Sequence, residues 1–288
     1  MTHRERFAPS PTGPLHLGHA FSALTAYDRA RTADGECLIR IEDIDQTRAR
    51  PEWEAAIFDD LHWLGLRWPE PVLRQSERMP AYQAALETLR DHGHLFACSC
   101  TRKDIAEALR APQEGAPVRG PDGLIYPGTC RDKRLQPGKP LPRDVAIRLD
   151  MRHATRGLQS LTFHETGNGP DRATGPIEIP LATLPDSIGD IVLARRDIGT
   201  SYHLAVVVDD AHQEITHVTR GEDLMDATAI HVLLQNLLGL PTPIYHHHRL
   251  IRDDTGKRLA KRDDALAISQ HRRDGKSAAD IRRELGLG

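Results

Sequence analysis

The chain has 288 residues, of which 39% are hydrophobic and 27% are charged, with a formal net charge of −3. This length allows about two domains, and the composition is that of a folded globular protein. No apolar run approaches the roughly 20 residues that span a bilayer, and the opening MTHRERFAPSPTG lacks the apolar core of a signal peptide. We therefore expect a cytoplasmic location and no membrane. Four cysteines are too few for a disulfide scaffold.

The charge is unevenly distributed, which matters for the kind of partner. Residues 249–288 hold 11 Lys and Arg against 7 Asp and Glu, whereas the rest of the chain is acidic. A basic end could contact nucleic acid, but an ordinary solvated helix face gives the same bias without any partner.

The first elements predict a βαβ unit. Residues 5–10 are typical of a short strand, and residues 16–34 of a helix that is closed by Gly35. Residues 36–43 form a second apolar strand of the kind buried in a parallel sheet. Strand, helix and strand in this order predict a doubly wound α/β fold.

The rest of the chain continues this pattern around an insertion. Pro and Gly are frequent between residues 110 and 185, which indicates short strands and long loops. The predicted helices lie near 52–64, 77–91 and 224–240, and the predicted strands at 201–210 and 214–223. We divide the chain into the first half of the α/β domain (1–97), an insertion (98–185), the second half of the α/β domain (186–248) and a short basic helical region (249–288).

The stretch HLGH contains the first candidate site. His16 and His19 are three residues apart, so at a helix start they share one face, and Gly18 leaves room for a flat ligand. Histidines at the positive end of a helix can donate hydrogen bonds to phosphate oxygens. Two surface histidines without a role are the alternative.

A second motif, GKRLAKRDD at residues 256–264, follows the last expected strand and offers a basic loop to a triphosphate. Together with APSPTGPLHLGH it resembles the KMSKS and HIGH motifs of the class I aminoacyl-tRNA synthetases. The stretches RIEDIDQTR, YHLAVVVDD and VTRGEDL resemble the glutamyl branch of that family. The chain departs from the pattern at Arg258 and Ala260, where the family commonly has Lys and Ser.

The resemblance implies a Rossmann-type catalytic core that activates L-glutamate with ATP. By this resemblance His16, Gly18, His19 and Lys261 bind ATP, and the two histidines hold phosphate oxygens during catalysis. Lys261 and Arg258 would neutralise the departing pyrophosphate together with Mg²⁺, for which no dedicated protein cage is needed.

The glutamate pocket follows from the same resemblance and from charge. Glu42 suits the ammonium group, while Arg6, Arg220 and the Tyr202 hydroxyl suit the carboxylates, since Arg binds a carboxylate through two parallel hydrogen bonds. Backbone or side-chain groups of Ala8 and Ser10 line the same pocket by family analogy. A simple ion pair between Arg6 and Glu42 on adjacent strands is the alternative.

Three cysteines cluster in the insertion. Cys98, Cys100 and Cys130 with a fourth donor can form a closed, structural zinc site, and the resemblance implies Tyr126 as the fourth ligand. The alternatives are three buried free thiols, or His94 as the ligand. Cys37 lies in a predicted core strand and is expected to be inert. In YHHHR, residues 245–249, alternate strand side chains face opposite ways, which disfavours a metal site.

The acceptor is the least constrained part of the interpretation. Only 26 residues follow Arg262, whereas full-length glutamyl-tRNA synthetases continue into an anticodon-binding domain. The chain resembles a truncated branch whose members join glutamate to the queuosine base of tRNA(Asp), with the anticodon stem-loop in the catalytic core. Charging of tRNA(Glu), another acceptor, a small-molecule adenylyltransferase and an inactive binding module remain alternatives. No protein partner is implied.

Overall fold

A computed structural model describes residues 2–109, 119–121, 123–251 and 266–287. The N-terminal part forms the predicted βαβ unit, in which β1 (Arg4–Phe7) pairs in parallel with β2 (Glu36–Ile41) across α1 (Leu17–Thr32). The short strand β3 (Leu73–Arg74) extends this sheet in parallel beside β2. The doubly wound pattern read from the sequence is therefore present in the first half of the chain.

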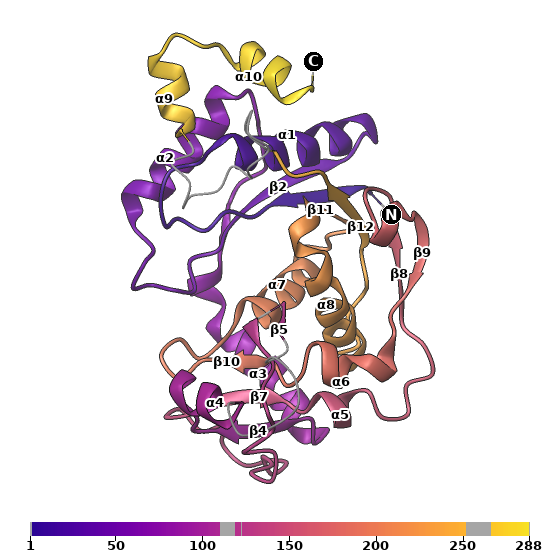
Figure 1. Ribbon diagram of the computed structural model, residues 1–288. Coiled ribbons are helices and arrows are strands. Elements are labelled where there is room, and N and C mark those ends of the chain that lie inside the picture. The colour runs from indigo at the N-terminus through magenta and orange to yellow at the C-terminus, as the bar shows by residue number, and fades with distance from the viewer. Residues whose placement is uncertain (1, 110–118, 122, 252–265, 288) are drawn as a thin grey trace.

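The second half supplies the other parallel strands (Figure 1). Strands β11 (His217–Gly221) and β12 (Ile244–His248) pair in parallel. Just before β11, the Thr216 N–H donates to the Arg4 carbonyl oxygen at 3.0 Å, so β11 lies beside β1. The carboxyl ends of β1, β2, β11 and β12 consequently meet along one edge, where open α/β sheets bind ligands.

Helices cover this sheet and connect it to a second, smaller sheet, which is formed by residues 95–98, 146–149 and 192–194. The longer ones are α2 (Pro51–Trp63), α3 (Met79–Asp91), α7 (Tyr202–His212) and α8 (Met225–Leu237). The short elements are α4 (Arg102–Ala108), β5 (Arg119–Gly120), β6 (Gly123–Leu124), α5 (Met151–Ala154), α6 (Leu184–Ser187), η1 (Gln75–Arg78), η2 (Pro170–Arg172), η3 (Leu181–Thr183) and η4 (Glu222–Leu224). Among the described helices, none is long and apolar enough to cross a membrane.

The strand predicted at residues 201–210 is wrong, because this segment is helix α7. Ser201 caps the helix by accepting a hydrogen bond from the Leu204 N–H. Packed between α3, α8 and the sheet, α7 is buried on nearly all sides, including Leu204, Val207 and Asp210. A helix buried all round has no polar face, so its apolar run imitates that of a buried parallel strand.

The predicted insertion does not form one separate unit. Strand β4 (Leu95–Cys98) pairs antiparallel with β7 (Ala146–Leu149), and β7 pairs with β10 (Val192–Ala194) in a small sheet. Strands β8 (Thr162–Glu165) and β9 (Gly175–Glu178) instead extend the sheet of β11 and β12. Strand pairing therefore crosses the proposed boundary at residue 185, because Glu165 pairs with Tyr245 of β12.

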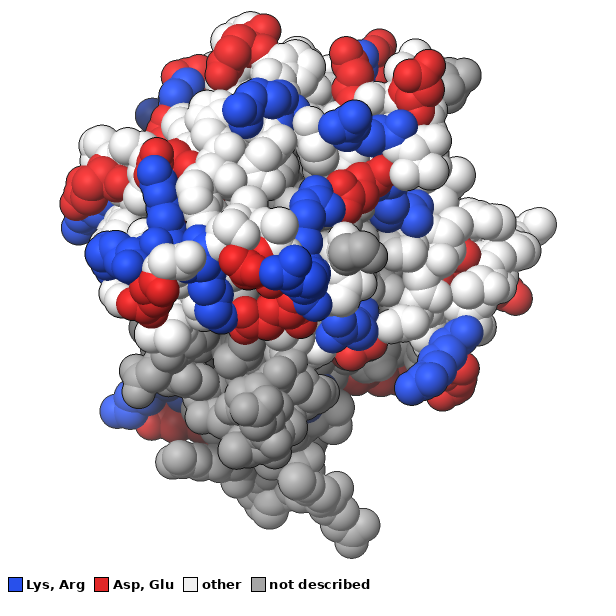
Figure 2. All heavy atoms as spheres, turned by 90° about the horizontal axis from the view of Figure 1, so that it is seen from above, with Lys and Arg blue, Asp and Glu red and all other residues white. Residues whose placement is uncertain are grey.

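The C-terminal region is helical, as predicted, in α9 (Ile268–Arg273) and α10 (Ala278–Leu285). Ile268 and Ile281 are fully buried in the core that includes α1. Arg282 reaches Asp28 of α1 at 2.7 and 3.0 Å, and Arg272 pairs with Asp59 at 2.9 Å. Figure 2 accordingly shows blue and red side chains mixed on this face rather than one basic patch.

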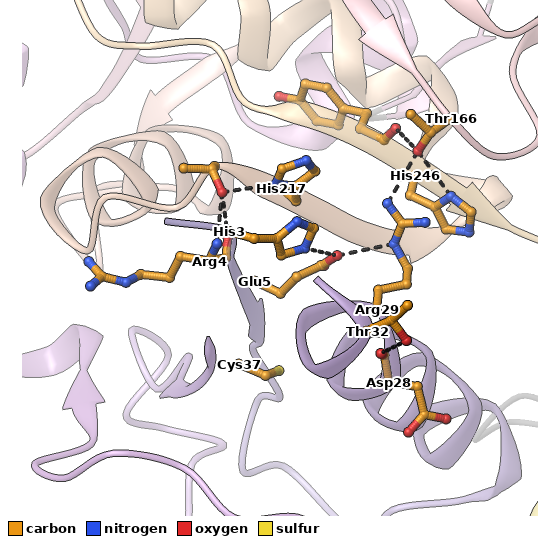
Figure 3. Close-up of polar contacts among 12 residues, drawn as sticks. His3, Arg4, Glu5, Asp28, Arg29, Thr32, Cys37, Thr166, His217 and His246 are labelled. Carbon is orange, nitrogen blue, oxygen red and sulfur yellow. Dashed lines mark hydrogen bonds and ion pairs between the residues drawn. The ribbon is translucent and has the colours of Figure 1, made fainter. Parts of the chain in front are cut away.

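The amino end of β1 is fixed by a polar cluster on the side away from the carboxyl edge (Figure 3). Glu5 is fully buried and accepts a hydrogen bond from Arg29 Nε of α1 at 3.1 Å. Arg29 also donates to Thr166, which follows β8, at 3.3 Å. The His3 and His217 rings stack with their centroids 3.7 Å apart. Cys37 is buried nearby, and burial raises the pKa of its thiol to about 12, as expected for an inert thiol.

Candidate active site

One pocket of about 470 Å³ opens at the carboxyl edge of the parallel strands. It brings together every sequence-predicted substrate residue that the structure describes, namely Arg6, Ala8, Ser10, His16, Gly18, His19, Glu42, Tyr202 and Arg220. These residues come from β1, the loop after it, the start of α1, the end of β2, α7 and β11. Further lining residues, which the sequence analysis did not assign to the substrate pocket, include Thr12, Ser22, Thr219, Asp223 and His248.

The two histidines of HLGH form the N-terminal cap of α1. His16 Nδ1 accepts from the Gly18 N–H at 3.1 Å, and His19 Nδ1 accepts from the His16 N–H at 3.2 Å. A neutral imidazole that accepts at Nδ1 carries its proton at Nε2. Both rings line the pocket with centroids 3.8 Å apart. The arrangement therefore provides two imidazole N–H donors beside the positive end of a helix.

Four side chains of alternating charge, each at most 9% exposed, form one charged wall, of which Arg6 and Glu42 line the pocket. Arg6 Nε donates to Asp210 Oδ1 at 3.0 Å, and Arg40 Nη1 donates to the same oxygen at 2.7 Å. Arg40 Nη2 also donates to Glu42 Oε1 at 3.2 Å. The direct Arg6–Glu42 ion pair considered as an alternative is not among the ion pairs of the described residues. Asp210 holds Arg6 by Nε, and among the described residues no hydrogen bond engages the two terminal nitrogens of Arg6, which are therefore available to a ligand.

The charges of this wall are set by its members. Burial alone would raise the pKa of Asp210, but Arg6 and Arg40 hold it below its ordinary value. Burial raises the pKa of Glu42, against the opposing effects of Arg40 and Arg6. A carboxylate whose charge is disfavoured by burial gains most from an incoming cation. Glu42 is thus suited to an ammonium group.

Arg220 lines the pocket and is 5% exposed. Its three nitrogens donate to His247 Nε2 at 3.0 Å, His231 Nδ1 at 3.0 Å and Thr228 Oγ1 at 2.7 Å. In the described part of the chain, Arg220 forms no ion pair with a carboxylate. Tyr202 also lines the pocket, and burial raises its pKa, so its hydroxyl stays protonated as a donor.

Lys261, Arg258 and Ala260 lie outside the described residues. The two ends of their segment are at the pocket, since Ile251 lines it and Ala267 forms a β-bridge with His16. The Ile268 N–H also donates to the Leu15 carbonyl oxygen at 2.9 Å. The described residues on either side of the basic motif thus lie close to HLGH.

The predicted zinc ligands converge at the end of β4, the strand that Cys98 closes. The sulfur atoms of Cys98, Cys100 and Cys130 lie within 4.8 Å of one another, with Cys100 and Cys130 3.6 Å apart. The Tyr126 hydroxyl is 3.4 Å from the Cys98 sulfur and 3.5 Å from that of Cys100. Tetrahedral zinc with Zn–S bonds of about 2.3 Å requires sulfur atoms about 3.8 Å apart. The cluster therefore fits a zinc ion.

His94, the alternative zinc ligand, lies elsewhere, with its Nδ1 3.1 Å from Nδ1 of His153. The histidines of YHHHR also have separate partners. His246 contacts Thr166, His247 contacts Glu165 and Arg220, and His248 contacts Ser22. Among the described residues, the three cysteines are the one cluster with metal-ligand spacing.

The sequence interpretation missed the residues that hold the pocket arginines. Asp210 is the last residue of YHLAVVVDD, where two adjacent aspartates are visible in the sequence. Because this stretch was predicted as a strand, the sequence did not indicate that Asp210 contacts Arg6. Arg40 lies between the apolar residues Ile39 and Ile41 of β2, which is an unusual place for a charge and was the available signal. His231 lies within the apolar helix α8 and carried no signal of its own.

Comparison with known proteins matches residues 3–287 to the family of class I tRNA synthetases (E and Q), catalytic domain. A glutamyl-Q tRNA(Asp) synthetase of Rhodobacter capsulatus is 59% identical over 98% of this chain and 99% of its own length. One of Geobacter sulfurreducens is 40% identical over 98% of this chain and 80% of its own length.

Among solved structures, a glutamate tRNA ligase of Elizabethkingia meningosepticum superposes with a TM-score of 0.69 and 29% identity. The match covers 91% of this chain but 52% of that ligase, so the chain spans about half the length of the full ligase. The matched family, the relatives of similar length and the pocket at the HLGH cap agree, and the chain belongs to the class I tRNA synthetases of the E and Q group and, within them, to the glutamyl-Q tRNA(Asp) synthetase family.

Proposed function

We propose that the protein activates L-glutamate with ATP and transfers it to the queuosine base of tRNA(Asp). The observation that carries the proposal is the pocket at the carboxyl edge, which is lined by two arginines, Glu42 and the HLGH cap. The relatives that share nearly the whole chain bear the name of this activity.

In the first step the α-carboxylate of glutamate attacks the α-phosphorus of ATP. The new bond joins a carboxylate oxygen to phosphorus, the bond to the β-phosphate oxygen breaks, and pyrophosphate leaves with its electrons. The carboxylate is already ionised at neutral pH, so no general base is required. Catalysis then consists of positioning the two substrates and stabilising the charge on phosphate oxygens.

The residues take roles that match their chemistry. Glu42 accepts hydrogen bonds from the ammonium group, and Arg6, Arg220 and Tyr202 bind the carboxylates, with Ala8 and Ser10 lining the pocket. His16 and His19 donate from Nε2 to phosphate oxygens, and Gly18 leaves space for the nucleotide.

Lys261 and Arg258 belong to the segment between Ile251, which lines the pocket, and Ala267, which forms a β-bridge with His16. In this proposal they neutralise the pyrophosphate, and Mg²⁺ would supply a further counter-charge.

In the second step a hydroxyl of the queuosine cyclopentenediol attacks the activated carbonyl carbon. The bond from this carbon to the AMP phosphate oxygen breaks, AMP leaves, the hydroxyl proton is released, and an ester remains. The anticodon stem-loop of tRNA(Asp) would therefore approach the same edge of the sheet. Cys98, Cys100, Tyr126 and Cys130 hold a structural Zn²⁺, which fixes the loops that follow β4.

The experiment measures transfer of labelled glutamate to tRNA(Asp) with and without queuosine, beside tRNA(Glu). We expect labelling of tRNA(Asp) only when queuosine is present. Exchange of pyrophosphate into ATP with each amino acid tests the activation step separately. Labelling of tRNA(Glu) at its 3′ end, with none on queuosine-bearing tRNA(Asp), would refute the acceptor.

A further inference from the structure

Arg220 is held by an unusual set of partners. Buried arginines are commonly neutralised by carboxylates in direct contact, as Arg6 is by Asp210 in this pocket. The three acceptors around Arg220 are instead two imidazole nitrogens and a hydroxyl oxygen, and all three residues are at most 2% exposed. A guanidinium has five N–H donors, so the hydrogen bonds among the described residues leave one N–H on each terminal nitrogen for the pocket.

The hydrogen-bond partners define the form of His247. Its Nδ1 lies 2.5 Å from Oε2 of the fully buried Glu165, so Nδ1 carries a proton and donates to the carboxylate. Nε2 then has a lone pair, which accepts from Arg220 Nε. Glu165 is itself fixed by the backbone N–H groups of Gly167 and His247 at 2.7 and 3.0 Å. Glu165 thus orients an imidazole that orients the arginine.

The second imidazole follows the same logic on helix α8. His231 Nδ1 lies 3.0 Å from Arg220 Nη1 and accepts from it, which leaves the proton at Nε2. Nε2 lies 3.0 Å from His203 Nδ1 of α7, which accepts that proton in a hydrogen bond. Burial and the positive charge of Arg220 both lower the pKa of His231 well below its ordinary value, in agreement with a neutral ring.

We propose that Thr228, His231 and His247 are positioning residues for glutamate activation, which fix the Arg220 guanidinium with neutral acceptors while leaving its charge to a substrate carboxylate. This inference rests on the proposed function of the pocket. A carboxylate in place of any of the three would bind Arg220 equally well but would compete with the substrate for the same cation. The three residues would act only through Arg220 and would not touch the substrate.

The test uses pairs of variants that remove or keep each acceptor. Thr228→Val removes one oxygen and Thr228→Ser keeps it. His231→Leu removes Nδ1, whereas His231→Asn places an amide oxygen near the same position. His247→Leu and His247→Gln form the equivalent pair for Nε2. As matched control, His246→Leu alters the neighbouring residue of β12, which contacts Thr166 rather than Arg220.

The readout is glutamate-dependent exchange of pyrophosphate into ATP. We expect the acceptor-removing variants to raise the KM for glutamate by about tenfold to a hundredfold, because a hydrogen bond to a charged group is lost. The KM for ATP and the kcat should change by less than about threefold. The acceptor-keeping variants and His246→Leu should stay near the wild-type KM.

Two results separate this proposal from the proposed function. If the wild-type protein shows no exchange with glutamate, the proposed function is wrong, and calorimetric titration of each variant with L-glutamate decides the positioning role alone. If the wild type is active but Thr228→Val keeps the wild-type KM for glutamate, the proposal is overturned. Thr228→Val also decides the case if a Leu variant fails to fold, because it conserves the shape of the side chain. A lower kcat with an unchanged KM in all variants would indicate a merely structural role and would also overturn it.

Discussion

Replacement of Asp210 by Asn tests whether the charged wall of the pocket holds Arg6 in place. Asn has the same shape but lacks the negative charge that Arg6 and Arg40 share at Oδ1, at 3.0 and 2.7 Å. All three side chains are at most 7% exposed, so water cannot replace the lost partner.

The magnitude follows from this geometry. Two donors on one oxygen keep the guanidinium groups about 6 Å apart, where two cations repel by about 3 kcal/mol at an effective dielectric constant of about 20. Removal of one partner from a buried ion pair costs about 3 to 5 kcal/mol. We therefore expect Asp210→Asn to lower the free energy of unfolding by about 3 to 5 kcal/mol. Because Arg6 loses its anchor, the KM for glutamate should rise by about tenfold or more.

Asp209→Asn is the matched control, because Asp209 is the adjacent and fully buried acid of α7. It accepts hydrogen bonds from Gln75, Tyr82 and Arg78 at 3.0, 2.6 and 3.2 Å, away from the pocket. Urea unfolding should show a loss of stability in both variants, whereas pyrophosphate exchange should show a raised KM for glutamate only in Asp210→Asn. An unchanged KM in folded Asp210→Asn, or an equal rise in both, would refute this reasoning.

Three further predictions concern other parts of the molecule. Elemental analysis should find one zinc per chain, and Cys130→Ser should lose it and make residues 98–130 more sensitive to proteolysis; zinc-free wild type contradicts the assignment. His19→Ala should lower the kcat of exchange by about tenfold to a hundredfold while the KM for glutamate stays within about threefold, and a change confined to that KM contradicts the role. Burial and Asp59 raise the pKa of Asp60 to about 6, so its ionised form destabilises the fold above that pH. Asp60→Asn should therefore raise the free energy of unfolding at pH 8 by about 1 to 3 kcal/mol, with the gain vanishing by about pH 4; an equal gain at both pH values excludes this cause.

The first half of the fold could be predicted because its signals are local. Alternation of apolar strands with an amphipathic helix, and the turn at Gly35, mark the βαβ unit without any tertiary information. Helix α8 was also predicted, since Gly239 and Pro241 end it. In contrast, α7 is buried on nearly all sides. Its sequence therefore lacks the alternation of apolar and polar faces, with a period of about 3.6 residues, by which a helix is identified.

The pocket residues that belong to a local sequence motif could be predicted. The residues whose role depends only on contacts distant in sequence could not. His16 and His19 are fixed by hydrogen bonds within their own helix start. The Arg220 partners lie 8, 11 and 27 residues away in sequence, and Glu165 lies 82 residues from His247. Such pairs leave no spacing pattern in one sequence. They became visible only when β11, α8, β12 and β8 were placed together.

The two arginines of the pocket differ in how their charge is balanced, and this difference bears on substrate choice. Arg6 has a carboxylate in direct contact, so an incoming ligand meets a cation that is already largely compensated. The charge of Arg220 is balanced by Glu165 only through the ring of His247, at a greater distance. Because the interaction between charges falls with distance, Arg220 presents the stronger positive field. If Arg220 binds the side-chain carboxylate of glutamate, as proposed, a neutral amide in its place would leave that field unanswered, and we expect Arg220 to contribute more than Arg6 to discrimination against glutamine.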